Sequence, residues 1–254
     1  MSLHPLQAET GQIIELRDAE QARAVDRTNL GGSWLYFFWK RSVDVLLATL
    51  GLIVLMPLLL VVALAIRIDS PGPAVFTQDR VGTRRRRSGK RTESWELKHF
   101  KIYKFRSMYT DADQRVHIEH IRRYTQNALS VDGSANAAYK VKADPRITRV
   151  GRFLRRSSID ELPQLWNVIK GDMSLVGPRP VPVYEVDGYQ PNHYGRLAAR
   201  PGITGLWQVA GRGRVSFDEM VALDLQLIER RSIMFELGIL LRTLPAVVRG
   251  SGAS

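Results

Sequence analysis

The chain has 254 residues, a formal net charge of +12 and no cysteine. Its composition is that of a folded protein, which excludes a wholly disordered chain, and the absence of cysteine excludes disulfides and thiolate metal sites. The charge is uneven, because the first 33 residues carry −2 and the remainder therefore carries +14. This positive charge predicts an anionic partner, which is nucleic acid, anionic lipid or a phosphorylated substrate.

Residues 1–33 are polar and predict a peripheral arm. An aromatic cluster, Trp34–Trp39, then precedes an uncharged run from Val45 to Ile66, which exceeds the ~18 residues that mark a membrane helix. We therefore expect residues 34–67 to be embedded in a membrane. A buried core helix is the alternative. A secretory signal is disfavoured because the run starts late and is too long.

Pro57 lies near the middle of the apolar run and predicts a kink, because proline removes a backbone donor and presses on the preceding turn. Each half of the run reaches only about half of the ~30 Å hydrocarbon layer. This favours a re-entrant helix that enters and leaves on the same side. Basic residues flank both ends, but a spanning helix would also satisfy the charge rule, so both arrangements stay open.

The remainder, residues 68–254, shows a mixed pattern that predicts a small α/β domain. Residues 74–78 and 100–105 are predicted short strands. Between them lies a strongly basic stretch, Arg84–Arg91. It is either a solvated loop or a contact with anionic lipid head groups, where each basic residue contributes about 1 kcal/mol.

Three later segments predict helices. Apolar residues between Leu162 and Ile169 recur with helical spacing, and Gly171 provides the stop. Ser216 and Glu219 have the spacing of a capping box, which predicts a helix start. The segment 233–248 is rich in Leu, Ile and Val but carries charges, so it either lies against the membrane surface or packs in the core.

Asp160 and Glu161 are adjacent carboxylates that follow a basic approach. A structural reading exists, because Ser158 and Glu161 match a capping box. Pro163 weakens it, since a helix starting at Ser158 would place the proline beyond the free N–H groups of the first turn. A start nearer Asp160 leaves both acids at the helix mouth. One acid would then attack phosphorus or hold a metal while the other handles a proton.

A second motif, Gly177-Pro-Arg-Pro180, places Arg179 between two prolines that fix the backbone. Such a stiff loop presents a planar guanidinium at low entropic cost, which suits bidentate phosphate binding. The segment 201–212 likewise combines turn residues, a short strand and Arg212. Taken alone, each arginine is more often a surface ion-pair partner than a ligand.

Together these motifs resemble the bacterial sugar transferase family, the monotopic phosphoglycosyltransferases. The resemblance runs from Lys40 to the end, with its motifs in one order. The matching segments are Lys40–Asp44, Val75–Gln78 with Arg80, Tyr103–Met108, Asp144–Thr148, Ser158–Leu165, Gly171–Pro180 and Pro201–Arg212.

The resemblance implies one re-entrant helix, a small mixed α/β catalytic domain and interfacial amphipathic helices, at the cytoplasmic face of the bacterial inner membrane. It implies ping-pong chemistry. Asp160 would attack the β-phosphate of a UDP-sugar, releasing UMP, and undecaprenyl phosphate would then take the sugar phosphate from the enzyme. Such a reaction would begin the assembly of an exopolysaccharide or O-antigen.

The same resemblance assigns roles to single residues. Glu161 would assist as acid/base or orienting partner, and Mg²⁺ would be bound by Asp160 and the diphosphate. By motif position the phosphate and nucleotide contacts are Lys104, Arg155, Arg179 and Arg212. Membrane lipid is an implied partner and nucleic acid is not. A homodimer is one open alternative for the oligomeric state, and the motifs do not reveal which sugar is transferred.

The chain departs from the family where Ser-Pro often marks the helix break, because here the pair is Met56-Pro57. The Arg84–Arg91 stretch is unusually basic, and the several membrane helices that precede the domain in larger members are not expected in the polar arm. Two other functions compete. One is a membrane-tethered binding protein that uses its basic face for nucleic acid or lipid, and the other is a Mg²⁺-dependent lipid diphosphatase.

Overall fold

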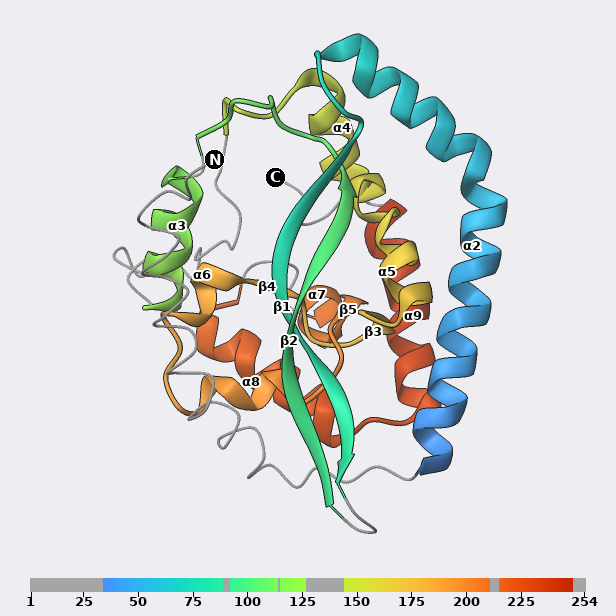
Figure 1. Ribbon diagram of the computed structural model, residues 1–254, viewed down its shortest axis with the longest axis vertical. Coiled ribbons are helices and arrows are strands. Elements are labelled where there is room, and N and C mark those ends of the chain that lie inside the picture. The colour runs from blue at the N-terminus through green and yellow to red at the C-terminus, as the bar shows by residue number, and fades with distance from the viewer. Residues whose placement is uncertain (1–33, 89–91, 114, 127–143, 211–214, 249–254) are drawn as a thin grey trace.

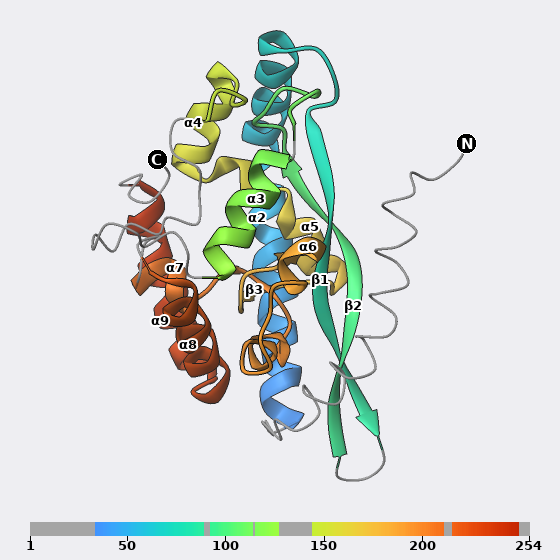
Figure 2. The same cartoon turned by 90° about the vertical axis from the view of Figure 1, so that its left-hand side faces the viewer.

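The computed structural model describes residues 34–88, 92–113, 115–126, 144–210 and 215–248, and it has a mixed α/β architecture (Figures 1 and 2). The elements are α2 (Trp34–Asp69), β1 (Val75–Ser88), β2 (Thr92–Phe105), α3 (Arg115–Thr125), α4 (Arg149–Ser157), η1 (Ile159–Glu161), α5 (Gln164–Lys170), β3 (Ser174–Val176), β4 (Val181–Pro182), α6 (Val183–Val186), η2 (His193–Leu197), β5 (Gly202–Thr204), α7 (Leu206–Ala210), α8 (Phe217–Glu229) and α9 (Ile233–Val248). Strands β2, β1 and β4 form an antiparallel sheet in that order, and β3 pairs with β5 in parallel. The predicted arm, residues 1–33, lies outside the described residues.

The apolar run forms the long helix α2, whose 36 residues correspond to about 54 Å of helix. Figure 1 shows α2 curving along one side of the molecule, and the helix continues through Pro57. Only 11% of its most apolar 18-residue window is buried. This exposure argues against the alternative of a buried core helix and leaves a long apolar face uncovered.

The N-terminal part of α2 is held on the domain by a buried carboxylate. Asp44 accepts hydrogen bonds from the Ser174 hydroxyl at 2.8 Å and from the Leu175 N–H at 3.2 Å. Lys40 lies 2.9 Å from Asp44 and 2.7 Å from Glu236. The side chains at the start of α2 therefore join the helix to both β3 and α9.

The C-terminal end of α2 is held by different residues. The buried Arg106 guanidinium donates to the carbonyls of Ser70 at 2.6 Å and Ile66 at 3.3 Å, and so adds donors at the end of the helix, where carbonyls lack intrahelical partners. Asp69 accepts the Val150 N–H at 3.1 Å in the first turn of α4. Both ends of α2 thus contact the same domain, and its C-terminus fixes where α4 begins.

The two predicted strands belong to one long antiparallel ribbon, β1–β2, that is much longer than we expected. The prediction of a loop across the whole basic stretch is wrong, because residues 84–88 lie in β1, while residues 89–91 are outside the described part. Arg85 pairs in register with Trp95, which is buried with Val81. Hydrogen bonds between the two strands and this buried apolar side stabilise the strand, although its arginine-rich sequence does not indicate one.

Helix α5 occurs where the apolar spacing predicts it and ends at Gly171, whose φ of 87° is a left-handed value that favours glycine. Gln164, Asn167 and Val168 are buried, whereas Trp166 is half exposed. Leu165 and Ile169 are partly buried against the main core, and α5 also contacts α2. Both polar and apolar side chains of α5 therefore face the protein, and Trp166 points outward.

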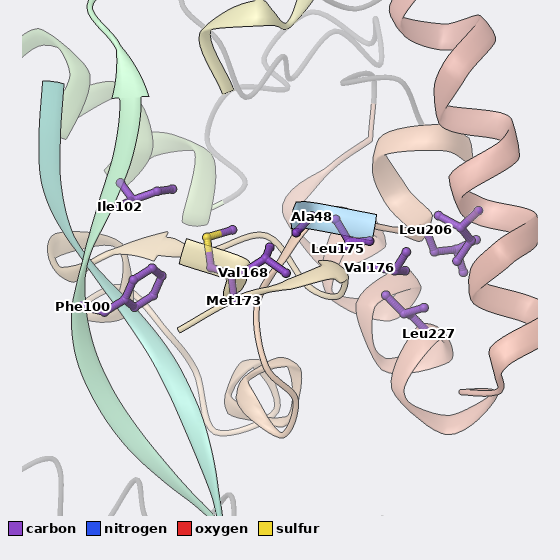
Figure 3. Close-up of a cluster of buried hydrophobic side chains, with 10 residues drawn as sticks. Ala48, Phe100, Ile102, Val168, Met173, Leu175, Val176, Leu206 and Leu227 are labelled. Carbon is purple, nitrogen blue, oxygen red and sulfur yellow. The ribbon is translucent and has the colours of Figure 1, made fainter. Parts of the chain in front are cut away.

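The main core joins the ribbon to α2, α5 and the parallel pair β3–β5. Figure 3 shows this cluster, with Phe100 and Ile102 from β2 facing Met173 and Val168. Helix α9 contributes the fully buried Ile239 from one side, whereas Met234 and Leu241 on the other side are exposed. Both readings of segment 233–248 therefore hold in part, because one face packs in the core and another is apolar and uncovered.

Helix α8 begins with the predicted capping box. The Ser216 hydroxyl accepts the Glu219 N–H at 3.3 Å, and the Glu219 carboxylate accepts the Ser216 N–H at 2.8 Å. The first residue of the helix, Phe217, is fully buried and meets the ring of Tyr124 edge to face, with centroids 5.8 Å apart. This contact packs α8 against α3.

Replacing Asp44 with Ala should lower the free energy of unfolding by about 3 kcal/mol, because it leaves Ser174 and Leu175 donors buried without their acceptor. The measurement is thermal unfolding of the full chain in detergent micelles. Ser42→Ala is the matched control on the same helix, since Ser42 is exposed and bonds only to the Phe38 carbonyl within α2. Equal melting temperatures for the two variants would contradict the anchoring role of Asp44.

Candidate active site

Asp160 and Glu161 lie on the short turn η1 between α4 and α5. Helix α4 ends at Ser158, the one non-glycine residue with positive φ in the described part of the chain, at φ 56°. A left-handed residue at this point costs on the order of 1 kcal/mol and turns the chain sharply away from the helix axis. The two carboxylates are therefore presented on a tight corner rather than along a helix face.

The capping-box reading of Ser158 and Glu161 is wrong. The Ser158 side chain makes no capping bond, and the Glu161 carboxylate instead lies 3.2 Å from the Arg179 guanidinium. Helix α5 proper starts at Gln164, later than the start near Asp160 that we expected, with Pro163 at its N-cap. Proline is tolerated there because its missing N–H would have no partner in the first turn.

Lys104 reaches this corner from the end of β2. Burial lowers the pKa of Lys104 to about 8, and the positive charges of Arg80 and Arg179 act in the same direction. The charges of Asp160 and Glu161 oppose this shift. The two predicted site residues Lys104, from β2, and Arg179, from the β3–β4 loop, therefore lie in the same electrostatic environment as Asp160 and Glu161.

Asn167 fixes the distance between α5 and the strand that carries Lys104. Its side-chain oxygen accepts the Tyr103 N–H at 3.0 Å, and its amide donates to the Lys101 carbonyl at 2.8 Å. The amide thus reproduces the two bonds that a neighbouring strand would make. As a result, the lysine, the turn η1 and the start of α5 form one rigid unit.

Arg179 is held by a loop that has little freedom to move. The Gly177 N–H donates to the Thr204 carbonyl at 2.9 Å, and a Cβ at Gly177 would lie 2.3 Å from the Arg200 carbonyl, so glycine is required there. The Pro178 carbonyl accepts the Gly202 N–H at 2.8 Å. The parallel pair β3–β5 therefore supports the stiff arginine loop that the two prolines predict.

Arg80 is a buried cation that the sequence did not single out as a site residue. Its guanidinium donates to the Pro180 carbonyl at 3.0 Å and to the Gln78 side chain at 2.7 Å. It lies at 5% exposure on β1, next to the loop that carries Arg179. Arg80 therefore supports the loop and adds positive charge beside Lys104.

Asp144, Arg146 and Arg155 contribute further charges near the carboxylate pair. Asp144 and Arg146 form a bidentate pair, with N···O distances of 2.8 and 2.6 Å. The Arg146 hydrogen bond lowers the pKa of Asp144, so the carboxylate is ionised over the physiological range. Burial lowers the pKa of Arg155, while the charges of Asp160 and Asp144 act against that shift. Arg155 therefore belongs to the same charge cluster.

His117, on α3, is a site residue that sequence reasoning missed. Burial lowers its pKa to about 4, and the charges of Arg80, Lys104 and Arg146 add to the effect. The imidazole is therefore neutral at pH 7. No motif marks it, because α3 reads only as a charged helix. Its position becomes visible only once α3 packs on α6, where the His117 ring meets the Tyr184 ring edge to face with centroids 6.1 Å apart.

The structure therefore brings Asp160, Glu161, Lys104, Arg155 and Arg179 into one charge cluster. Arg212 lies outside the described residues, so its predicted role is untested. Within the described ranges there is no group of three or more His, Asp or Glu side chains of the kind that holds a metal alone. Magnesium is commonly bound by one or two carboxylates together with substrate phosphates, and the oxygens of Asp160 and Glu161 suit that ligand set.

A sequence model of the family described as bacterial sugar transferase matches residues 35–250. The chain belongs to this family. It is 42% identical over 215 residues to a galactosyl transferase, CpsE, of Streptococcus agalactiae, covering 84% of this chain and 43% of that protein. It is 39% identical over 216 residues to an undecaprenyl-phosphate galactose phosphotransferase of Salmonella typhimurium, covering 85% and 42%.

A third relative is closer in length. The UDP-glucose:undecaprenyl-phosphate glucose-1-phosphate transferase of Caulobacter vibrioides is 40% identical over 222 residues, covering 84% of this bacterial sugar transferase chain and 71% of that protein. The chain spans less than half the length of the Streptococcus and Salmonella relatives. The shared part includes the helix α2, the turn η1 and the Arg179 loop.

The Lys104 side chain should titrate with a midpoint of about 8 instead of its ordinary 10.5. Because the folded state then holds fewer protons than the unfolded state between pH 8 and 10.5, this group's contribution to stability rises with pH across that window. The measurement is a ¹³C NMR titration of lysine-labelled protein, with the signal assigned by Lys104→Arg. A bound phosphate-bearing ligand should raise the midpoint. A midpoint near 10.5 without ligand would contradict the burial of this lysine among cations.

Proposed function

We propose that this chain transfers a sugar 1-phosphate from a UDP-sugar to undecaprenyl phosphate. The observation that carries the proposal is a pair of adjacent carboxylates, on a tight corner, inside a cluster of cations from four different segments. The cations are Arg80, Lys104, Arg155 and Arg179, and their charges act on one another's pKa values. The names of the Salmonella and Caulobacter relatives both specify transfer of a sugar phosphate to undecaprenyl phosphate.

The first step is displacement at the β-phosphorus of the UDP-sugar. A carboxylate oxygen of Asp160 forms a bond to this phosphorus as the bond to the bridging oxygen breaks, and UMP leaves with the electron pair. The product is a phospho-sugar aspartyl enzyme. In the second step an oxygen of undecaprenyl phosphate attacks the same phosphorus and restores the Asp160 carboxylate. In this two-step route the UDP-sugar and undecaprenyl phosphate, both negatively charged, react with the enzyme one after the other instead of meeting each other directly.

The surrounding side chains supply what such a transfer demands, which is placement and positive charge around the phosphoryl oxygens. Lys104 and Arg155 lie close enough to Asp160 to sense its charge and would meet the phosphates there. Arg179 pairs with Glu161 at 3.2 Å and orients it, so Glu161 would act as the base or orienting partner. Asp160, with Glu161 beside it, would hold Mg²⁺, which when bound neutralises negative charge on the diphosphate.

The packing of α2 supports a monotopic arrangement at the cytoplasmic face of the inner membrane. Residues near both ends of the helix, such as Asp44 and Ile66, are buried against the same domain. A spanning helix would carry one of these ends to the opposite side. Large apolar side chains face outward between them, with further ones on α4, α5 and α9, namely Phe153, Trp166 and Met234. These faces would lie in the lipid, beside the anionic head groups that the basic residues attract.

Two other functions are compatible with the same charges but explain less of the site. A binding protein for lipid or nucleic acid needs cations and gives no role to a carboxylate pair on a strained corner. A lipid diphosphatase would use the same cations to place water rather than a second phosphate. The reaction products distinguish the three functions.

Asp160→Asn should reduce UMP release from a UDP-sugar by about 10³-fold or more, because the amide cannot attack phosphorus. The measurement is UMP formation by the full chain in detergent with undecaprenyl phosphate and Mg²⁺, screened over UDP-glucose and UDP-galactose. Asp111→Asn, at an exposed position, is the control and should keep wild-type activity. Chelation of divalent cations with EDTA should also stop the reaction, and added Mg²⁺ should restore it.

Transfer of sugar label into the organic phase is the second readout of this experiment. Label that stays in water while phosphate is released would identify the diphosphatase instead. A fully active Asp160→Asn variant would overturn the assigned nucleophile. An unfolded variant would be recognised by circular dichroism, and Glu161→Gln, which should lose only part of the activity, then serves as the second test.

Single cysteines at the two ends of α2 should be accessible from the same side of the membrane. The chain has no cysteine of its own, so Ser42→Cys and Pro73→Cys each introduce one exposed label site. A membrane-impermeant maleimide should modify both in inverted inner-membrane vesicles and neither in spheroplasts. Modification of one site from each side would mean that α2 spans the bilayer.

A further inference from the structure

A cavity of about 480 Å³ lies at the N-terminal end of α2, away from the carboxylate pair. It is bounded by the first turns of α2, the β1–β2 ribbon, the loop after β3 and the connection from α8 to α9. In Figure 1 this end of α2 is at the lower right, while η1 follows α4 toward the other end of the ribbon. Neither Asp160 nor Glu161 lines the cavity. Its volume is in the ordinary range of small-molecule sites.

Four arginines line this cavity, and two of them share one aromatic ring. The guanidinium of Arg85 lies 3.8 Å from the centroid of the Phe37 ring, and that of Arg231 lies 5.2 Å from it. Each contact is a favourable cation–π interaction, but two like charges on a single ring repel each other. These contacts place two positive charges at the wall of the cavity.

Arg200 adds to the positive charge of the cavity. Its Nε is buried and has no hydrogen-bond partner among the described residues. Burial lowers the pKa of Arg200, and the nearby Arg41 acts in the same direction. A buried donor without an acceptor is costly, so a ligand oxygen at this position would be favourable.

Two carboxylates also line the cavity, and both are bound by Lys40. Lys40 lies 2.9 Å from Asp44 and 2.7 Å from Glu236, and Asp44 also accepts bonds from Ser174 and Leu175. The lining therefore holds five cations against two carboxylates. Its electrostatic character is that of an anion site.

The outer wall of the cavity is aromatic and faces the solvent side of α2. Trp34 and Phe38 line it and are more than half exposed, and Trp95 lies behind Phe37 with ring centroids 6.1 Å apart. Exposed aromatic residues at the start of an apolar helix mark the level of lipid head groups. The cavity thus joins an anion-binding interior to an apolar wall at the height of the membrane surface.

We propose that this cavity binds the head-group phosphate of an anionic membrane phospholipid, with the Phe37 arginines and Arg200 around the phosphate and the acyl chains against Trp34 and Phe38. This lipid site is separate from the transfer site and does not depend on the proposed function. It would still affect that site. Gly177 and Pro178 line the cavity, and the next residue, Arg179, pairs with Glu161.

The test is a titration of the full chain in detergent with dihexanoyl phosphatidylglycerol and, separately, dihexanoyl phosphatidylcholine, followed by calorimetry. We expect the anionic lipid to bind at least tenfold more tightly. The double variant Arg85→Gln/Arg231→Gln should abolish this preference, and Arg200→Gln should weaken it. Arg230→Gln is the matched control, because Arg230 is the exposed neighbour of Arg231 and does not line the cavity.

Equal binding of the two lipids by the wild type, or an unchanged preference in both arginine variants, would overturn the proposal. So would displacement of phosphatidylglycerol by UMP, which would assign the cavity to a nucleotide. If the double variant fails to fold, Arg200→Gln alone decides the question. Asp160→Asn should bind the lipid like the wild type, so loss of transfer activity and loss of this site are distinguishable.

Discussion

The architecture depends on holding one long apolar helix against a strongly basic domain at both of its ends. At the start, Asp44 is buried with hydrogen bonds to β3 and a charge partner one turn earlier. At the C-terminal end, the Arg106 guanidinium donates hydrogen bonds to the carbonyls that end the helix. There the Asp69 carboxylate also accepts a backbone N–H from the first turn of α4. A buried ion with its partners in place is costly to disrupt. Lipid alone would leave the helix free to rotate and slide, whereas these bonds fix its register.

The position of α2 determines the position of the candidate active-site residues. The first turn of α4 is hydrogen-bonded to Asp69 at the end of α2, and α4 is followed by the left-handed Ser158. The position of α2 therefore determines where Asp160 lies. From the opposite side, Asn167 locks α5 to β2 and hence to Lys104. The site is assembled from segments far apart in sequence, and each is fixed by backbone hydrogen bonds. For the proposed phosphoryl transfer, such a site would need little reorganisation when a diphosphate binds, as electrostatic stabilisation requires.

Local motifs allowed much of this to be predicted from the sequence. The apolar run, the capping box of α8 and the stop at Gly171 are local signals, and all three are present in the structure. The stiff arginine loop was also predictable, because proline and glycine restrict the backbone wherever they stand. Asp160 and Glu161 were chosen by motif, and the structure places them with Lys104, Arg155 and Arg179, whereas the fourth expected cation, Arg212, lies outside the described residues.

What was missed depends on contacts between distant segments. An arginine run reads as a loop, and only its pairing with residues 92–96 across the ribbon makes residues 84–88 a strand. The apolar spacing of α5 indicated a face directed into the core, and Leu165 and Ile169 do pack against it, but Trp166 on the same face is half exposed. His117 and Arg80 carry no motif for chemistry. Their roles arise from burial beside Lys104, which a sequence read one residue at a time does not reveal.

The amide of Asn167 has one more consequence, for the exposed border of the sheet. Strand β2 is an outer strand, and open strand borders invite pairing with another copy of the chain. By occupying the N–H of Tyr103 and the carbonyl of Lys101, this side chain removes two of the groups that such pairing requires. Asn167 thereby covers part of this border and leaves less of β2 open to pairing with a second copy.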